Sequence, residues 1–239
     1  MQCLILAGGR GERMRPLTDE IPKVLLPVAG KPFLQWQIDY LKNYGIKEII
    51  LAVGYKAEKI ENYFGNGEKF GVKITYSREK EPLGTGGAIK NAENLIKNNN
   101  ILVLNGDSFV DIDIKKMLEF HQKKKKPITI AVRKTKDVNR YGSVLINKDS
   151  IVTSFQEKKE KNGDIKECFI NAGVYIFQKK ILKYFPLDRC VSLEKEIFPK
   201  FVNKITAFKI NGYFIDIGIP KDYKKANIDF KKPDFLKNN

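Results

Sequence analysis

Three glycines and an arginine stand close together near the N-terminus, at Gly8, Gly9, Gly11 and Arg13. Glycine lacks a Cβ, so the backbone can adopt positive φ there and bring its N–H groups close to the oxygens of a phosphate. Arg13 can add two parallel hydrogen bonds to the same phosphate. We therefore predict a phosphate-binding loop, although these four residues alone could also form a tight turn with a surface arginine.

A carboxylate that could hold a metal ion lies at Asp107. It closely follows the apolar run at residues 101–104, which is typical of a buried strand, and the carboxyl ends of such strands border the ligand crevice of an open α/β sheet. A hard cation that bridges phosphates prefers carboxylate oxygens at such a place. Taken alone, Asp107 could equally be a turn or helix-cap residue. We expect the nearby Asp113 to cap a helix at residues 114–122.

The first half of the chain alternates strand and helix patterns, as α/β proteins do. Right-handed crossovers then favour a mostly parallel mixed sheet with helices on both faces. The ligand crevice should lie at the C-terminal ends of its strands, where Gly8, Gly9 and Asp107 fall. The expected strands are residues 3–7, 48–53, 72–76 and 101–104, and the expected helices are residues 33–44, 57–64 and 87–97.

The second half has more strand patterns than helix patterns and shows neither a linker nor an internal repeat. We expect it to add a substrate-binding part to the same sheet, so residues 1–239 are interpreted as a single domain. The expected strands here are residues 128–132, 143–146, 169–177 and 205–210, and the expected helices are residues 179–184, 193–201 and 221–230.

Composition limits the class of protein. The chain is 42% hydrophobic and 30% charged, as globular proteins are, and no apolar run reaches the ~18–20 residues that cross a bilayer. Without a secretion signal, the cytoplasm is favoured. Cys3, Cys168 and Cys190 are odd in number and far apart, which argues against a disulfide framework or a zinc site. The net charge of +16 leaves a basic nucleic-acid-binding module open, although phosphorylated small molecules would also explain it.

The longer N-terminal pattern L-A-G-G-x-G-x-R-M-x-P-L-T…P-K resembles the hallmark of the sugar-nucleotidyltransferase family, the enzymes that make nucleotide sugars. The resemblance implies a Rossmann-like, GT-A-like fold with a nucleotide-binding half at residues 1–112 and a sugar-phosphate-binding half at residues 113–239. It implies catalytic roles for Arg13, on the triphosphate, and Lys23, on the reacting phosphates. The nucleotide-binding backbone would come from Leu6, Ala7, Gly8, Gly9 and Gly11.

A second segment, E-P-L-G-T-G-G-A at residues 81–88, is similar to the family's E-P-L-G-T-[AG]-G-A, whose backbone lies along the nucleobase. By this resemblance Glu81, Gly84, Thr85 and Gly86 bind the nucleotide. By itself the segment could equally be a loop that Thr85 caps into a helix.

Further segments resemble the family's metal and sugar sites. Y-F-I-D-I-G-I-P at residues 213–220 is similar to W-x-D-x-G-T-P, with Phe214 for the tryptophan and Ile219 for the threonine, and implies that Asp216 joins Asp107 in holding Mg²⁺. The segments Y-G, E-K and N-A-G resemble the sugar-binding segments, although Lys159 replaces the proline that usually follows E-K. They imply a site for the sugar phosphate in which Glu157 and Asn171 hold sugar hydroxyls, Gly142 offers backbone contacts and Lys158 reaches the phosphate. Gly173 belongs to the same site.

The resemblance therefore implies an Mg²⁺-dependent nucleotidyltransferase that joins a sugar 1-phosphate to a nucleoside triphosphate and releases pyrophosphate. The phosphate would attack directly, and His121, the one histidine, is not expected to take part. The chain looks most like guanylyltransferases acting on heptose or mannose 1-phosphate, and GTP with heptose 1-phosphate, for surface polysaccharide synthesis, is the preferred pair. Thymidylyl-, uridylyl- and cytidylyltransferases on other hexose 1-phosphates remain alternatives. No nucleic acid or membrane partner is expected, and a homo-oligomer is left open.

Overall fold

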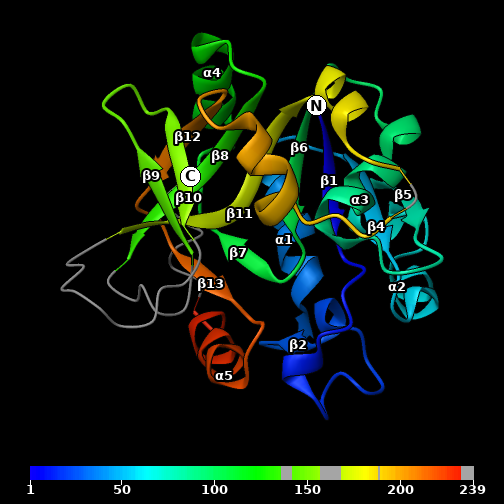
Figure 1. Cartoon of the computed structure of the whole chain (residues 1–239). Helices are drawn as coiled ribbons and strands as arrows, with labels where there is room; N and C mark the ends of the chain where they lie inside the picture. Colours follow the sequence, from blue (N-terminus) through cyan, green and yellow to red (C-terminus); the bar gives the residue numbers. More distant parts are fainter. Residues whose placement is uncertain (136–141, 157–167, 188, 233–239) are drawn as a thin grey trace.

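A mixed sheet of nine strands runs through both halves of the part of the chain that the computed structural model describes, residues 1–135, 142–156, 168–187 and 189–232 (Figure 1). Four strands from the first half are parallel and lie in the order β5, β4, β1, β6. Parallel neighbours need helical crossovers, which the alternating pattern supplies. These strands are β1 (Gln2–Leu6), β4 (Glu48–Val53), β5 (Lys73–Arg78) and β6 (Asn100–Asn105).

The second half extends this sheet mainly with antiparallel strands. β11 pairs antiparallel with β6, with Val174 opposite Leu104, and β8 and β9 pair antiparallel with β11. β10 continues from β9, and β12 lies parallel to β8. The expected mixed sheet is therefore confirmed. Its added strands are β8 (Ile128–Thr135), β9 (Ser143–Ile146), β10 (Val152–Gln156), β11 (Cys168–Gln178) and β12 (Ile205–Ile210).

Two hydrophobic cores lie on opposite faces of the sheet. In β1, Cys3 and Ile5 belong to one core and Leu4 to the other, as the alternation of a strand requires. Helices α1, α2, α4 and α5 close the first core, and α3 with the short helices at residues 179–201 closes the second, so helices cover both faces as expected. The helices are α1 (Phe33–Asn43), α2 (Ala57–Phe64), α3 (Gly84–Asn91), α4 (Ile114–Lys124) and α5 (Pro220–Asp229).

Several expected elements keep their predicted bounds, and others differ for local reasons. The Asp113 carboxylate accepts the N–H of Lys116 at 3.0 Å and caps α4, which confirms that expectation. The helix expected at residues 193–201 is instead a π turn (Leu193–Ile197) followed by a 3₁₀ turn (Phe198–Phe201), because Pro199 has no N–H to continue an α-helix. The segment Lys179–Tyr184 is also a 3₁₀ helix.

Two short ladders were not predicted from the sequence. β2 (Pro27–Val28) pairs with β3 (Lys31–Pro32), and β7 (Ser108–Val110) pairs with β13 (Phe214–Asp216). Strands of two or three residues are too short to show an alternating pattern. Within the described residues, none of the helices has the length and hydropathy that crossing a bilayer would require.

An aromatic cluster fastens the C-terminal helix to the rest of the protein. Phe230, at the end of α5, is buried, and its ring lies 4.9 Å from Trp36 and 5.1 Å from Phe109, both at edge-to-face angles. Phe33 and Tyr213 lie within 6.2 Å and 6.0 Å of the same ring. The cluster therefore joins α5 to α1 and to the β7–β13 ladder.

We predict that Phe230→Ala lowers the free energy of unfolding by about 3–4 kcal/mol, because it removes the ring at the centre of this cluster and leaves a cavity. Urea denaturation measures the loss. Ile228→Ala on the same helix is the matched control, since Ile228 is 71% exposed and its truncation should cost no more than ~0.5 kcal/mol. Equal losses for the two variants would contradict the prediction.

Candidate active site

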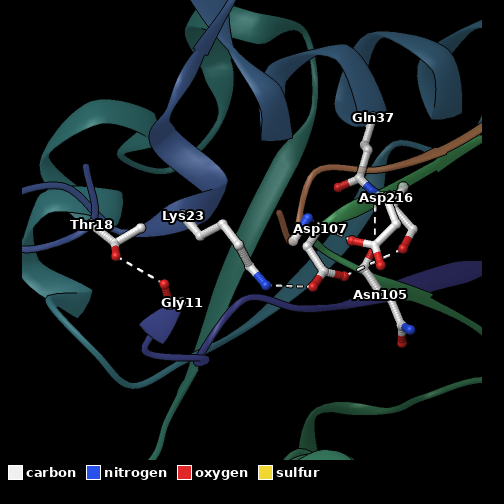
Figure 2. A network of polar contacts seen from close by, with 9 residues as sticks. Gly11, Thr18, Lys23, Gln37, Asn105, Asp107 and Asp216 are labelled. Carbon is white, nitrogen blue, oxygen red and sulfur yellow. Dashed lines mark hydrogen bonds and ion pairs between the residues drawn. The ribbon is translucent and has the colours of Figure 1, made fainter. Parts of the chain in front are cut away.

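Two aspartates far apart in the sequence become neighbours through the β7–β13 ladder. Asp107 lies in the turn between β6 and β7, and the ladder places Asp216 directly opposite Ser108. The N–H of Ile217 also donates to the backbone oxygen of Asp107 at 2.9 Å. Figure 2 shows both carboxylates side by side at this edge of the sheet. The structure therefore brings together the two carboxylates that the sequence singled out.

Lys23 reaches across to Asp107. Its Nζ lies 2.5 Å from Asp107 Oδ2, and the two side chains are 13% and 26% exposed (Figure 2). Desolvation raises the pKa of the Asp107 carboxyl, but the charge and hydrogen bond of Lys23 outweigh it, so the pKa lies below its ordinary value. Asp107 is therefore ionised and paired at neutral pH, with one face of the pair open to the crevice.

Gln37 holds the turn that carries Asp107. It is 2% exposed, and its Nε2 donates to the backbone oxygens of Asn105 at 2.8 Å and Ser108 at 2.6 Å. These bonds fix the backbone on both sides of Asp107. Sequence reasoning missed Gln37, although a signal was present, since it is a polar residue on the apolar face of α1, one turn from Leu34 and Leu41.

The glycine loop is built differently from the expectation. Of Gly8, Gly9 and Gly11, Gly11 alone has positive φ, at +67°, and its carbonyl oxygen accepts the Thr18 hydroxyl at 2.9 Å. Gly8 is needed for close packing instead, because a Cβ there would lie 2.9 Å from Glu79 Oε1. Gly9 faces open space. The positive φ predicted for Gly8 and Gly9 is wrong, but the loop does present open backbone at the end of β1.

Arg13 approaches the aspartate pair from the same loop. A Cβ added to Gly218 would lie 2.9 Å from Arg13 Nη2 and 2.8 Å from Asp216 Oδ1, so the guanidinium and this carboxylate both lie against Gly218. The N–H of Gly218 donates to Asp216 Oδ1 at 2.7 Å. Arg13 and Lys23 thus bring two cations to two carboxylates.

A cavity of about 270 Å³ opens beside this group and extends under the glycine loop. Lys23 and Asp107 lie in its wall, together with Asn105. Residues predicted to bind the nucleotide also line it, namely Leu6, Ala7, Gly8, Gly9, Gly84 and Thr85. A second cavity of about 160 Å³ shares Gly8, and Glu81 lines it.

Glu79 lines both cavities and was not predicted from the sequence. Its Oε2 accepts the N–H of Leu83 at 3.0 Å, which fixes the carboxylate beside Gly8. Burial raises the pKa of its carboxyl, and the hydrogen bond from Leu83 lowers it in part. In the sequence Glu79 stands just after β5 among other charged residues, and nothing there distinguishes it as a site residue from Lys80 or Glu81.

The segment Gly84–Gly87 forms the wall between the cavity and residues 189–193. Thr85 does not cap a helix, because α3 already begins at Gly84; its hydroxyl accepts the N–H of Leu193 at 2.9 Å. Gly86 is buried behind the cavity wall, and its N–H donates to the oxygen of Val191 at 2.8 Å. A Cβ at Gly84 would lie 2.7 Å from the same Val191 oxygen, so glycine is needed for this close approach. Helix α3 therefore begins at Gly84, three residues before the start predicted from the sequence.

The residues predicted to bind the sugar lie on β11 and beside β10. Gly173 has φ of +75°, and a Cβ there would lie 2.7 Å from Asn105 Nδ2, so only glycine allows β11 to pack on the end of β6. Asn171 lies two residues before Gly173 in the chain, beyond the end of β6. Gly142 packs against the backbone of Gln156. Glu157 and Lys158 lie outside the described residues.

Glu194 reaches this sugar-side region and was missed by the sequence analysis. Its Oε1 accepts a hydrogen bond from Asn171 Nδ2 at 3.1 Å, while the side chain keeps an exposed side. Crowding by protein atoms raises the pKa of its carboxyl; the Asn171 bond lowers it in part, and the charge of Asp107 adds to the rise. In the sequence, Glu194 stands in a run of charged residues that is indistinguishable from a solvated surface.

The oxygen ligands of the site suit a hard divalent cation. Asp107 lines the cavity and Asp216 lies beside it through the β7–β13 ladder, and the described residues contain no group of three or more metal-ligating side chains. Mg²⁺ commonly takes one or two carboxylates and completes its shell with water and substrate phosphates. The donor set therefore matches Mg²⁺ in the presence of a phosphorylated substrate.

Comparisons with known proteins show the family to which the chain belongs. The nucleotidyl transferase family matches residues 2–232. The D-glycero-alpha-D-manno-heptose 1-phosphate guanylyltransferases of Aneurinibacillus thermoaerophilus and Campylobacter jejuni are 44% and 45% identical, over 95% and 93% of this chain and 96% and 97% of their own. The crystal structure of HddC from Yersinia pseudotuberculosis complexed with GMP-PN has a TM-score of 0.84 at 40% identity, covering 96% of this chain and 99% of that one.

His121 lies in the core between α4 and the sheet, away from the cavity. It is 1% exposed, and its Nδ1 shares a 2.7 Å hydrogen bond with the hydroxyl of Thr129, which in turn pairs with Thr206 at 2.8 Å. Burial lowers the pKa of His121 to about 4. The imidazole is therefore neutral at physiological pH and part of the packing.

This burial predicts an acid dependence of stability. Between pH 6.5 and about 4, the unfolded chain binds a proton at His121 that the folded protein does not, so the free energy of unfolding falls as the pH falls through this range. From pH 7 to pH 5 the loss should be about 2 kcal/mol. Urea denaturation of the wild type and of His121→Gln at both pH values measures it. A variant with the same pH dependence as the wild type would contradict the assignment.

Proposed function

The chain belongs to the nucleotidyl transferase family, and we propose that it joins a heptose 1-phosphate to GTP, giving GDP-heptose and pyrophosphate. The observation that carries the proposal is the group formed by Asp107, Asp216, Arg13 and Lys23 beside the glycine-lined cavity. The choice of heptose and guanine is supported by two relatives that align with nearly the whole chain and are named as heptose 1-phosphate guanylyltransferases.

The reaction asks the protein for positioning and charge neutralisation. The phosphate of the sugar is already anionic, so its oxygen can attack the α-phosphorus of GTP without a general base. A new bond forms between that oxygen and the α-phosphorus, and the bond to the β-phosphate breaks as pyrophosphate leaves with the electron pair. Because both reactants are polyanions, Arg13 and Lys23 reduce their repulsion and stabilise the charge that develops on the leaving group.

We propose Mg²⁺ as the cofactor, held by Asp107 and Asp216. When bound, the ion would supply positive charge to the reacting phosphates. In the protein alone the ammonium group of Lys23 pairs with Asp107 Oδ2, and both residues lie in the cavity wall, where the phosphates would bind. The neighbouring N–H of Gly218 holds Asp216 in place for the same task.

Glu79 is proposed to read the guanine. A carboxylate offers acceptors alone, and guanine presents two adjacent donors, N1–H and the N2 amino group, on one edge. Uracil and thymine present a single N–H between two carbonyl oxygens, and a carboxylate repels those oxygens. Glu79 lies at the junction of the two cavities, fixed by the N–H of Leu83, and can accept both guanine donors there.

Several wider features of the proposal follow from the reaction. The substrates are soluble phosphates that occur in the cytoplasm, where we place the protein. GDP-heptose is an activated sugar, so a glycosyl transfer must consume it, and synthesis of a surface polysaccharide is the proposed use.

The proposed reaction is tested with a matrix of four nucleoside triphosphates against heptose, mannose and glucose 1-phosphates, with pyrophosphate release as the readout. GTP with heptose 1-phosphate should give the highest kcat/KM. EDTA should abolish release and added Mg²⁺ should restore it, because without the cation the negative charges of Asp107 and Asp216 would repel the phosphates. Activity that survives EDTA would contradict the metal assignment, and preference for another pair would contradict the substrates.

The guanine contact predicts that Glu79→Gln lowers kcat/KM for GTP by about 10- to 100-fold, since one of two charge-assisted hydrogen bonds is lost. The preference for GTP over UTP should fall with it, because the new amide can donate to a uracil oxygen. Glu68→Gln, an exposed change at the opposite end of β5, is the matched control. A variant that weakens all four triphosphates equally would show that Glu79 shapes the loop without reading the base.

A further inference from the structure

Asn171 has little hydrogen-bonding capacity left for a ligand. Its Nδ2 donates to the hydroxyl of Tyr175 at 2.8 Å and to Glu194 Oε1 at 3.1 Å, and its Oδ1 accepts the N–H of Gly173 at 3.1 Å. A primary amide has two N–H donors and two acceptor lone pairs. Both donors are therefore used, so the side chain expected to hold a sugar hydroxyl is occupied with protein groups.

The Glu194 carboxylate keeps hydrogen-bond acceptor positions that a ligand could use. Besides Asn171 and its own backbone N–H, no group in the described part of the chain donates to its carboxylate, which has about four acceptor positions. The side chain is exposed on one side. A carboxylate in this state is a strong acceptor for hydroxyl groups.

The surroundings place this carboxylate at the sugar side of the cavity. Asn171 lies beyond the end of β6, just past Gly173, which packs on Asn105 in the cavity wall. On the other side, the N–H of Leu193 is bound by Thr85, which also lines the cavity. Glu194 thus lies between Thr85, which lines the cavity, and Asn171, which stands two residues from a glycine that packs on the cavity wall. It is at the start of a π turn, an irregularity that often marks functional positions.

We propose that Glu194 binds hydroxyl groups of the sugar ring of the sugar 1-phosphate, and that Asn171 and Thr85 are positioning residues that aim it. The inference rests on the proposed function, since it assigns part of the sugar site of that reaction. Glu194 accepts the sugar hydroxyls with its free oxygen lone pairs, Asn171 fixes one oxygen, and Thr85 fixes the backbone one residue before it.

The test compares steady-state kinetics of Glu194→Gln and Glu194→Ala with the wild type. Both variants should raise KM for heptose 1-phosphate by about 10- to 100-fold and leave KM for GTP within about twofold, because a charge-assisted hydrogen bond to the sugar alone is lost. Glu196→Gln is the matched control on the same turn, since Glu196 contacts Arg189 and Ser192 outside the cavity. It should leave both KM values within about twofold.

The double variant Asn171→Ala with Glu194→Gln separates aiming from direct binding. If Asn171 acts through Glu194, Asn171→Ala alone should raise KM for the sugar, and adding it to Glu194→Gln should raise KM no further. Additive effects would overturn the positioning role of Asn171.

Two results would overturn the assignment of Glu194. One is an unchanged KM for heptose 1-phosphate in both Glu194 variants, with the wild type active; this leaves the proposed function standing. The other is an equal rise in KM for GTP, which would mean a general disturbance of the cavity wall. A wild type that uses no sugar 1-phosphate would overturn the proposed function itself, and this inference with it.

Discussion

β13 pairs with β7 over three residues, and this short ladder unites Asp107 and Asp216 at one edge of the cavity. The pairing alone would be weak, since each strand contributes few hydrogen bonds. It is strengthened from both sides, because Gln37 binds the turn beneath Asp107 and the aromatic cluster around Phe230 packs against the ladder. The rest of the candidate active site depends on this ladder, because without it Asp216 would not lie beside Asp107.

The ion pair of Lys23 with Asp107 stabilises the negative charge of a largely buried carboxylate. A largely buried carboxylate without a counterion costs several kcal/mol of desolvation, and a nearby second carboxylate adds repulsion. Lys23 and Arg13 offset this cost while the site is free of ligand. The same two cations remain close when polyanionic substrates arrive. The charges that stabilise the ligand-free site are therefore the charges that the proposed reaction needs.

The sequence predicted those parts of the protein whose signal is local. Parallel strands, amphipathic helices and the Asp113 cap depend on patterns a few residues long, and the structure confirms them. The glycine loop and Asp107 were singled out by local patterns that other structures could also explain, and the resemblance that spans the chain added Asp216. Gln37, Glu79 and Glu194 were missed, because each gains its meaning from a partner in another element: the turn at Asp107, the N–H of Leu83 or the amide of Asn171. The residue types next to each of them in the sequence do not show which distant group it will contact.

Residues 189–193 connect the two sides of the proposed reaction. Their backbone is bonded to the nucleotide side of the cavity at Leu83, Gly86 and Thr85, and the turn that follows carries Glu194 to the sugar side. The wall that supports the nucleotide therefore also sets the position of a sugar-binding carboxylate. A nucleotide that orders Gly84–Gly87 would restrict Glu194 as well, which lowers the entropy that the sugar must lose on binding. Because such coupling is reciprocal, we expect the two proposed substrates, GTP and the sugar 1-phosphate, each to tighten the binding of the other.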